Sequence, residues 1–197
     1  MLGPSRTGGF TLVEAVVVLA ISSVLLMAAG AMFQAAGNSM DVLAASQRVD
    51  WEIKRVLAEA CRDAKRASTA TLTIDSTDPT ADVLHVQVPN ADVTTGAIAW
   101  GYTDSTGAFR DGWAAEYRVV GTSLVRQVLS AAAVQQGGDL TLCRDVDLTR
   151  SGAPPEKGFQ ATLNGALLDL IVLVRDTTKD GRALTRREET TVHLMNP

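Results

Sequence analysis

The chain has 197 residues, of which 46% are hydrophobic, enough apolar material for one hydrophobic core beside a helical extension. Its formal net charge is −4. This acidic balance argues against a broad nucleic-acid surface, because phosphate binding needs a concentrated positive face and the basic runs here are short and interleaved with acids.

A long apolar run dominates the N-terminal part of the chain. Residues 15–33 form an uninterrupted stretch of 19 residues whose only polar members are Ser22 and Ser23. As a helix, such a stretch is long enough to cross the hydrocarbon layer of a membrane, which is about 30 Å thick. No later stretch matches it, so the sequence predicts one transmembrane helix that tethers a polar domain.

Small residues precede the apolar run, and one acid lies near its start. A secretory signal peptide has a shorter apolar segment, with its small-residue cleavage site after that segment. Here Gly8 and Gly9 come first, and Glu14 follows five residues after Gly9. The string GGFTLVEAVVVLA resembles the leader and helix start of type IV pilins and pseudopilins. The resemblance implies that prepilin peptidase cuts after Gly9 and that Phe10 becomes the N-methylated first residue.

The same resemblance implies a role for the acid. With residues 1–9 removed as the leader, Glu14 is the fifth mature residue, which in this family pairs with the N-terminal amine of an adjacent subunit during assembly. A carboxylate at the edge of an apolar zone is costly without a partner. Because Glu14 lies one helical turn after Phe10, it could meet the Phe10 amine of its own chain or that of a neighbouring subunit. The alternative is that Glu14 only reaches the lipid headgroups near the cytoplasmic face.

Helical periodicity continues beyond the apolar run. Apolar residues recur at steps of three or four from Val42 through Ala45, Val49, Ile53 and Val56 to Ala60. The spacing predicts one helix from about Phe10 to about Lys65. Its residues 10–33 would form the transmembrane or filament-core part, and residues 34–66 an amphipathic stalk.

The chain changes period after Ala67. Short segments rich in Val, Leu, Thr and Ile alternate polar with apolar residues, and turn-forming stretches separate them. We expect residues 67–197 to form a β-rich globular domain, an antiparallel sheet of about five to seven strands that ends in a hairpin over residues 167–195. The predicted fold class is α+β, with the long helix packed on this sheet.

A second resemblance lies in the β-rich part. The segment AEYRVVGTSLVRQV, residues 115–128, is similar to an element of J-type or W-type minor pseudopilins, in which a strand leads through a tight turn into a second strand. Tyr117, Leu124 and Arg126 take the positions of that element. The stalk end, residues 48–69, is also similar.

No constellation of residues in the sequence predicts catalysis or a cofactor. His85 and His193 stand alone in strand-like contexts without metal spacing. Asp176 and Asp180 are weak Ca²⁺ candidates, because two carboxylates fall short of the six to eight oxygen ligands that Ca²⁺ takes. An ordinary β-turn is favoured there, and the acids at 75, 78 and 82 are rated similarly. We expect no metal, no cofactor and no enzymatic activity.

The sequence allows two interpretations of its two cysteines, Cys61 and Cys143: a disulfide or two free thiols. In an oxidising compartment a disulfide between them would join the stalk to the sheet, worth on the order of 4 kcal/mol by chain entropy. The alternative is two buried thiols, with Cys61 on the flank of the apolar stripe.

Together these features predict a structural subunit rather than an enzyme. The expected role is that of a minor pseudopilin of a type II secretion-type pseudopilus, held in the bacterial inner membrane with its β-domain in the periplasm or outside the cell. Its expected partners are other pilins or pseudopilins, prepilin peptidase, the inner-membrane assembly platform and membrane lipid. The alternatives are a minor type IV pilin for priming, adhesion or DNA uptake, and a membrane-anchored binding domain that does not polymerise.

Overall fold

The computed structural model describes residues 11–91, 95–148 and 156–195. The contacts between residues divide the chain into two compact units, Met1–Leu43 and Ala44–Pro197. One helix followed by antiparallel sheets gives the α+β class that the sequence predicts.

The helix α1 runs without interruption from Leu12 to Ala64. It confirms the predicted span to within two residues at each end, because apolar residues at helical spacing persist through the stalk and good helix formers fill the positions between them. In the first unit its side chains are exposed almost throughout.

Within the second unit, α1 buries the predicted apolar stripe. The buried apolar residues of α1 are Ala45, Val49, Ile53, Val56, Ala60 and Ala64. Ile53 and Val56 are fully buried, and each such side chain contributes roughly 1.5 to 3 kcal/mol of transfer free energy. This stripe holds the second half of α1 on the β strands.

The largest sheet has five antiparallel strands in the order β1-β2-β6-β7-β8. Its strands are β1 (Leu72–Asp75), β2 (Val83–Val86), β6 (Ala114–Val120), β7 (Ser123–Leu129) and β8 (Leu140–Cys143). The predicted hairpin of residues 115–128 is its β6–β7 pair, in which Tyr117 lies opposite Arg126. Tyr117 and Leu124 are fully buried in the core.

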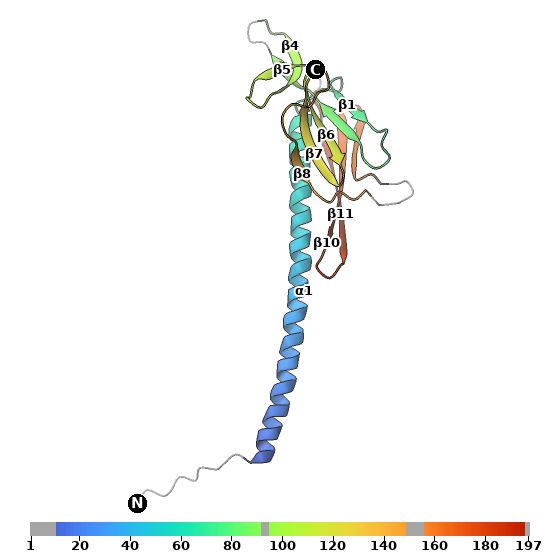
Figure 1. The fold of residues 1–197 in the computed structure, drawn as a ribbon. Helices are drawn as coiled ribbons and strands as arrows, with labels where there is room; N and C mark the ends of the chain where they lie inside the picture. Colours follow the sequence, from blue (N-terminus) through green and yellow to red (C-terminus); the bar gives the residue numbers. More distant parts are fainter. Residues whose placement is uncertain (1–10, 92–94, 149–155, 196–197) are drawn as a thin grey trace, which may run out of the picture. The chain divides into compact units, whose positions relative to one another are not determined.

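A second sheet has three strands in the order β11-β10-β9. They are β9 (Phe159–Asn164), β10 (Leu167–Thr177) and β11 (Ala183–His193), and β10 and β11 form the predicted C-terminal hairpin with eleven residue pairs. This hairpin lies along the second half of α1 (Figure 1), where Asp176 pairs with Arg48 at 3.4 Å and Arg186 with Asp50 at 3.0 Å.

The third sheet corrects the expected strand count. It consists of β3 (Val88–Ala91), β4 (Ile98–Thr103) and β5 (Phe109–Asp111), so the described residues form eleven strands, not five to seven. The short strands carry Pro89 and Gly101, which weaken a strand signal in sequence. A Cβ on Gly101 would lie 2.0 Å from the Arg110 carbonyl oxygen and 2.8 Å from Phe109 Cζ, so the neighbouring strand requires a glycine there.

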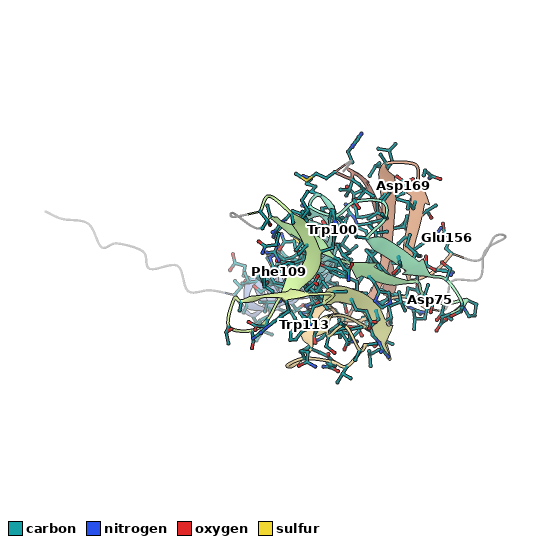
Figure 2. All side chains as sticks on the ribbon, turned by 90° about the horizontal axis from the view of Figure 1, so that it is seen from above. Asp75, Trp100, Phe109, Trp113, Glu156 and Asp169 are labelled. Carbon is teal, nitrogen blue, oxygen red and sulfur yellow. The ribbon has the colours of Figure 1, made fainter. Side chains whose placement is uncertain are left out.

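Figure 2 shows the β strands of the second unit with their side chains. Trp100, Phe109 and Trp113 gather toward the third sheet, whereas Asp75, Glu156 and Asp169 lie on the other side of the view. These three aromatic and three acidic side chains therefore lie on different sides of the unit in this view.

Candidate filament-assembly site

The predicted assembly residue Glu14 lies in the first turn of α1. Its Oε2 atom accepts hydrogen bonds from the Thr11 backbone N–H and from Thr11 Oγ1, both at 2.9 Å, and Thr11 Oγ1 in turn accepts the Glu14 N–H at 3.3 Å. This reciprocal arrangement is a capping box, which satisfies donors that a helix start leaves free. Glu14 therefore has a partner within its own chain at the start of α1.

The spacing of Thr11 and Glu14 could have revealed the capping box from sequence, because T-L-V-E has the required Thr-x-x-Glu form. From sequence, only the Phe10 amine and the lipid headgroups were expected as partners of Glu14. Gly9 and Phe10, the predicted cleavage and methylation positions, lie outside the described residues. The pairing of Glu14 with the Phe10 amine of a neighbour stays a prediction.

The helix that follows Glu14 exposes large apolar side chains on all sides. Val13, Leu19, Leu26, Met27 and Phe33 are each at least two thirds exposed. By length and composition, α1 qualifies as a membrane-crossing helix, and none of its most apolar window is buried within the chain. An isolated chain in water could not keep this much apolar surface exposed, so a membrane or the helices of other subunits must cover it.

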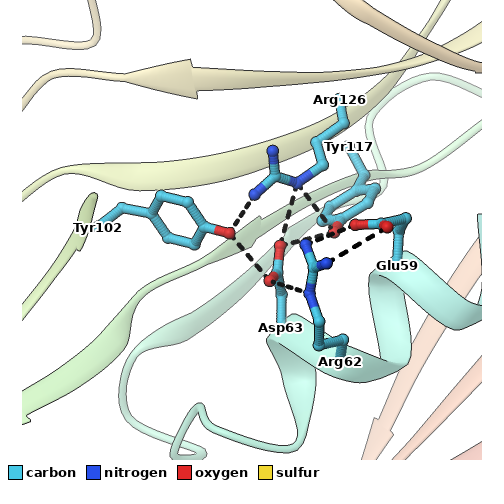
Figure 3. A network of polar contacts seen from close by, with 6 residues as sticks. All are labelled: Glu59, Arg62, Asp63, Tyr102, Tyr117 and Arg126. Carbon is cyan, nitrogen blue, oxygen red and sulfur yellow. Dashed lines mark hydrogen bonds and ion pairs between the residues drawn. The ribbon is translucent and has the colours of Figure 1, made fainter. Parts of the chain in front are cut away.

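At its other end, α1 carries a second carboxylate in an opposite environment. Asp63 is only 1% exposed. Its two oxygens accept hydrogen bonds from Tyr102 Oη at 2.9 Å, Tyr117 Oη at 2.7 Å and Arg126 Nε at 3.1 Å (Figure 3). The three donors come from β4, β6 and β7, so one carboxylate joins the last turn of α1 to two of the three sheets.

Arg126 completes this group, which we call the Asp63 node: Asp63, Tyr102, Tyr117 and Arg126. Its guanidinium carbon lies 5.0 Å from the ring centroid of Tyr102 and 6.0 Å from that of Tyr117, within the range of cation–π attraction. At the rim of the node, Arg62 approaches Asp63 at 3.7 Å and pairs with Glu59 at 2.5 Å. A buried carboxylate is thus fully paired, as its desolvation requires.

The ionisation of the node follows from its burial. Burial, reinforced by the Asp63 carboxylate, raises the pKa of Tyr102 to about 12 and raises that of Tyr117 further. Burial alone would lower the pKa of Arg126, but the Asp63 carboxylate and the two phenols outweigh it and raise that pKa. Both tyrosines therefore stay neutral donors and Arg126 stays charged at any physiological pH.

Asp63 and Tyr102 were not among the site residues predicted from sequence. A signal for Asp63 was present: it continues the buried stripe three residues after Ala60, so it is a charged residue at a core position. Tyr102 had no such signal, because it belongs to β4, a strand that was not predicted.

The structure does not form the disulfide that the sequence left open. Cys61 and Cys143 are free. Cys143 Sγ lies 3.4 Å from Glu52 Oε2, which also accepts the Arg144 N–H at 2.9 Å. Since Glu52 and Cys61 are nine residues apart on α1, about 13 Å along the helix axis, Cys143 is placed well away from Cys61. A disulfide needs Cα atoms within about 7 Å.

The predicted calcium candidates take part in other contacts. Asp176 pairs with Arg48 and accepts the Thr177 N–H at 2.7 Å, while Asp180 accepts a hydrogen bond from the Thr178 hydroxyl. Within the described ranges, no group of three or more His, Cys, Asp or Glu side chains is arranged to hold a metal ion.

The two histidines and the acid Asp82 each contact a different residue. His85 Nδ1 lies 3.5 Å from the buried Glu116, and His193 Nδ1 lies 3.0 Å from the Leu194 carbonyl oxygen. Asp82, one of the three clustered acids, is buried and pairs with Lys157 at 2.5 Å. These contacts give each residue a place in the fold of the second unit.

Comparison with known protein families identifies the N-terminal segment. A family model described as the prokaryotic N-terminal methylation motif matches residues 4–30. This motif is the signature of type IV pilins and pseudopilins, so it supports a type IV pilin-like protein, and the apolar N-terminal helix fits a membrane anchor. The motif points to a structural subunit that is processed by prepilin peptidase and assembles with other pilins. No curated protein and no solved structure matches the chain.

Proposed function

We propose that this chain is a minor pseudopilin, a structural subunit of a type II secretion-type pseudopilus that acts at the tip or in the initiation of assembly. The observation that carries the proposal is the methylation motif at residues 4–30, which includes the start of α1, a helix whose large apolar side chains are exposed in the part of the chain that the structure describes. The β6–β7 hairpin with Tyr117 and Arg126 supports the minor subtype, because it resembles the corresponding element of J-type and W-type pseudopilins.

In this proposal, prepilin peptidase removes residues 1–9 and methylates Phe10 on the cytoplasmic side of the inner membrane. The β unit lies in the periplasm. During assembly, the helix leaves the lipid and packs against the helices of other subunits, which replaces lipid contacts with protein contacts of similar apolar character. The residue that sets the axial position is Glu14, whose carboxylate exchanges its bonds with Thr11 for the charged amine of a neighbouring Phe10.

This exchange is energetically reasonable because the two partners differ in charge. The Thr11 hydroxyl and amide are neutral donors, whereas the amine is a cation, and charge-assisted hydrogen bonds are roughly twice as strong as neutral ones. Before assembly the capping box keeps the Glu14 carboxylate partnered at the membrane edge. In the filament, the Phe10 amine of a neighbouring subunit competes with Thr11 for the Glu14 carboxylate.

The proposal is tested first by the intact mass and N-terminal sequence of the protein from its native membrane fraction. We expect a chain that begins at methylated Phe10. An uncut Met1, or a start beyond Ala31, would contradict the proposal and leave an anchored or secreted β-domain.

The second test replaces the assembly residue. Glu14→Leu should abolish recovery of the chain with sheared filaments, and Glu14→Gln should reduce it strongly, since the amide keeps a hydrogen-bond acceptor but loses the charge. Ser22→Leu is the matched control, because it also adds a leucine to the apolar run and leaves Glu14 intact. Full incorporation of Glu14→Leu would contradict the role of Glu14 in assembly, whereas absence of the unaltered chain from sheared filaments would favour a plain membrane anchor.

A minor type IV pilin shares the same motif and the same expected effects. Deletion of the gene separates the two: loss of protein secretion with intact surface pili supports the pseudopilin, and loss of pili, adhesion or DNA uptake with normal secretion supports the pilin.

A further inference from the structure

The outward face of the stalk within the second unit carries an exposed aromatic residue among basic side chains. Trp51 is 62% exposed, and the guanidinium of Arg55 lies over its ring at 5.5 Å from the centroid. At 100° per residue, Trp51 falls on the opposite side of α1 from the buried residues Val49, Ile53 and Val56. This face is therefore turned away from the chain's own core.

The charges on this part of α1 divide into two groups by their partners. The four acids are all engaged within the unit: Asp50 with Arg186, Glu52 with the Arg144 backbone, Glu59 with Arg62, and Asp63 in its node. By contrast, Lys54, Lys65 and Arg66 have no ion pair among the described residues. The charge that the stalk offers to another molecule is consequently positive.

The β-rich part of the chain has the opposite balance. Residues 44–66 contain six basic and four acidic side chains, a net charge of +2, whereas residues 67–197 contain eleven basic and sixteen acidic ones, a net charge of −5. Asp75 and Asp78 lie on exposed turns, and hydrogen bonds from Thr77 and Thr80 lower the pKa of the respective carboxyl groups, which keeps them ionised. The basic stalk of one chain can therefore attract the acidic β-rich part of another chain.

We propose that Trp51, Lys54 and Arg55 form a docking surface for the acidic β-domain of the adjacent subunit in the filament. The inference rests on the proposed function and adds a contact outside the apolar helix segment. Trp and Arg are the residues most enriched among those that dominate interface energy, and the stacked Arg55 holds the indole in place before binding. The acidic partner matches the unpaired cations beside it, which favours correct pairing over non-specific contact.

A lipid headgroup layer would also attract a tryptophan with cations, but its position argues for a protein. Trp51 comes eighteen residues after Phe33, where the apolar run ends, and eighteen residues span about 27 Å of α-helix. Aromatic and basic residues that anchor a helix at the interface lie next to the apolar run, not five turns beyond it.

The test places the photo-reactive residue p-benzoylphenylalanine at position 51 of the full chain in its native host, irradiates the cells and identifies the product by mass spectrometry. We expect a cross-link to an acidic peptide of the β-domain of a chain that carries the methylation motif, whether a second copy or a sibling subunit. The matched control places the same residue at Val120, an exposed apolar position on β6, and should give little of that product.

The charge requirement is tested in the same experiment. Adding Lys54→Glu and Arg55→Glu should lower the cross-link yield by about fivefold or more, because like charges then face each other across the interface. Adding Glu59→Gln, which removes an acid from the same helix, should not lower it. An unchanged yield with the reversed charges would overturn the proposal, as would a product with lipid or with a protein outside the filament.

Failure of this inference can be told from failure of the proposed function. Methylated Phe10 and recovery with sheared filaments are measured in the same cells. If both are present and position 51 gives no subunit cross-link, the docking surface is refuted while the pseudopilin role stands. If neither is present, the proposed function fails and the docking surface fails with it.

Discussion

The two ends of α1 each carry a carboxylate that needs partners, and they obtain them in different ways. Glu14 is bonded to Thr11, three residues away on the same helix turn. Asp63 is bonded to residues that lie 39, 54 and 63 positions further along the chain. The first arrangement is local and can be exchanged for a new partner, whereas the second requires the whole β unit to be folded.

The difference shows how one helix serves two purposes. The first half of α1 leaves its apolar side chains exposed for contact with other molecules, and its acid Glu14 is hydrogen-bonded to the neighbouring Thr11. Its second half is fixed by a buried stripe and by the Asp63 node. Changes at the two ends should therefore separate assembly from folding.

The largest expected effect on stability comes from Asp63→Ala. The substitution leaves the Arg126 charge buried without its counter-ion and two phenols without an acceptor, and breaking a buried pair in this way costs about 3 to 5 kcal/mol. We expect this loss in the free energy of unfolding, measured by denaturant titration of the full chain in detergent with tryptophan fluorescence. Glu59→Ala removes only a partly exposed ion pair and should cost less than about 1 kcal/mol. Equal losses in the two variants would show that the node does not anchor α1.

The next effect concerns the third sheet, which meets the node through Tyr102. Gly101→Ala would force its Cβ against the Arg110 backbone and the Phe109 ring, and overpacking of this kind costs about 1 to 3 kcal/mol or more. Gly138→Ala is the control, because a Cβ at Gly138 meets nothing within 4 Å. The same unfolding measurement should place Gly101→Ala well below Gly138→Ala in stability.

Alkaline pH should weaken the node in a predictable direction. Tyr102 has a pKa of about 12 in the folded chain against 10 in the unfolded one, so the folded state holds the phenolic proton more tightly. Its contribution is therefore fully present below pH 10 and is lost as pH rises from 10 to 12, on the order of 2 kcal/mol. Tyr102→Phe should show a smaller loss of stability over the same pH window. A stability that is flat from pH 9 to 12 in the unaltered chain would contradict this account.

The smallest effect is chemical and concerns the thiols. Burial, with Glu52 adding to it, raises the pKa of Cys143, and burial raises that of Cys61, so both thiols react slowly with alkylating reagents in the folded chain. We expect little labelling of the native protein at pH 8 and two labels per chain after unfolding without a reductant. Labelling that needs a reductant would establish the disulfide instead.

Several features of the fold were accessible from sequence because each depends on neighbours along the chain. The stripe from Ala45 to Ala60 predicted the second half of α1, and the turn-forming stretch around Asp180 predicted the β10–β11 hairpin. Glu14 was found through the motif around it. These signals are periodicity and turn chemistry, which a single segment contains.

The features that sequence did not give depend on distant segments. Tyr117 and Arg126 were placed correctly on one hairpin, but their shared partner Asp63 belongs to the helix and Tyr102 to another sheet. The separation of Cys61 from Cys143 follows from which turn of α1 faces β8. The β3–β5 sheet escaped prediction because Gly101 and Pro89 break its alternation, while the Phe109 ring and the Arg110 backbone are what make the glycine necessary.

The position of the Asp63 node also matters for mechanical load. Asp63 is in the last turn of α1, immediately before the chain leaves the helix and continues to β1 at Leu72. A pull along the helix would otherwise pass into the β unit through the seven residues between Ala64 and Leu72. Bonds from one carboxylate to three strands share that tension among separate parts of the unit, so the joint can resist force without a covalent cross-link.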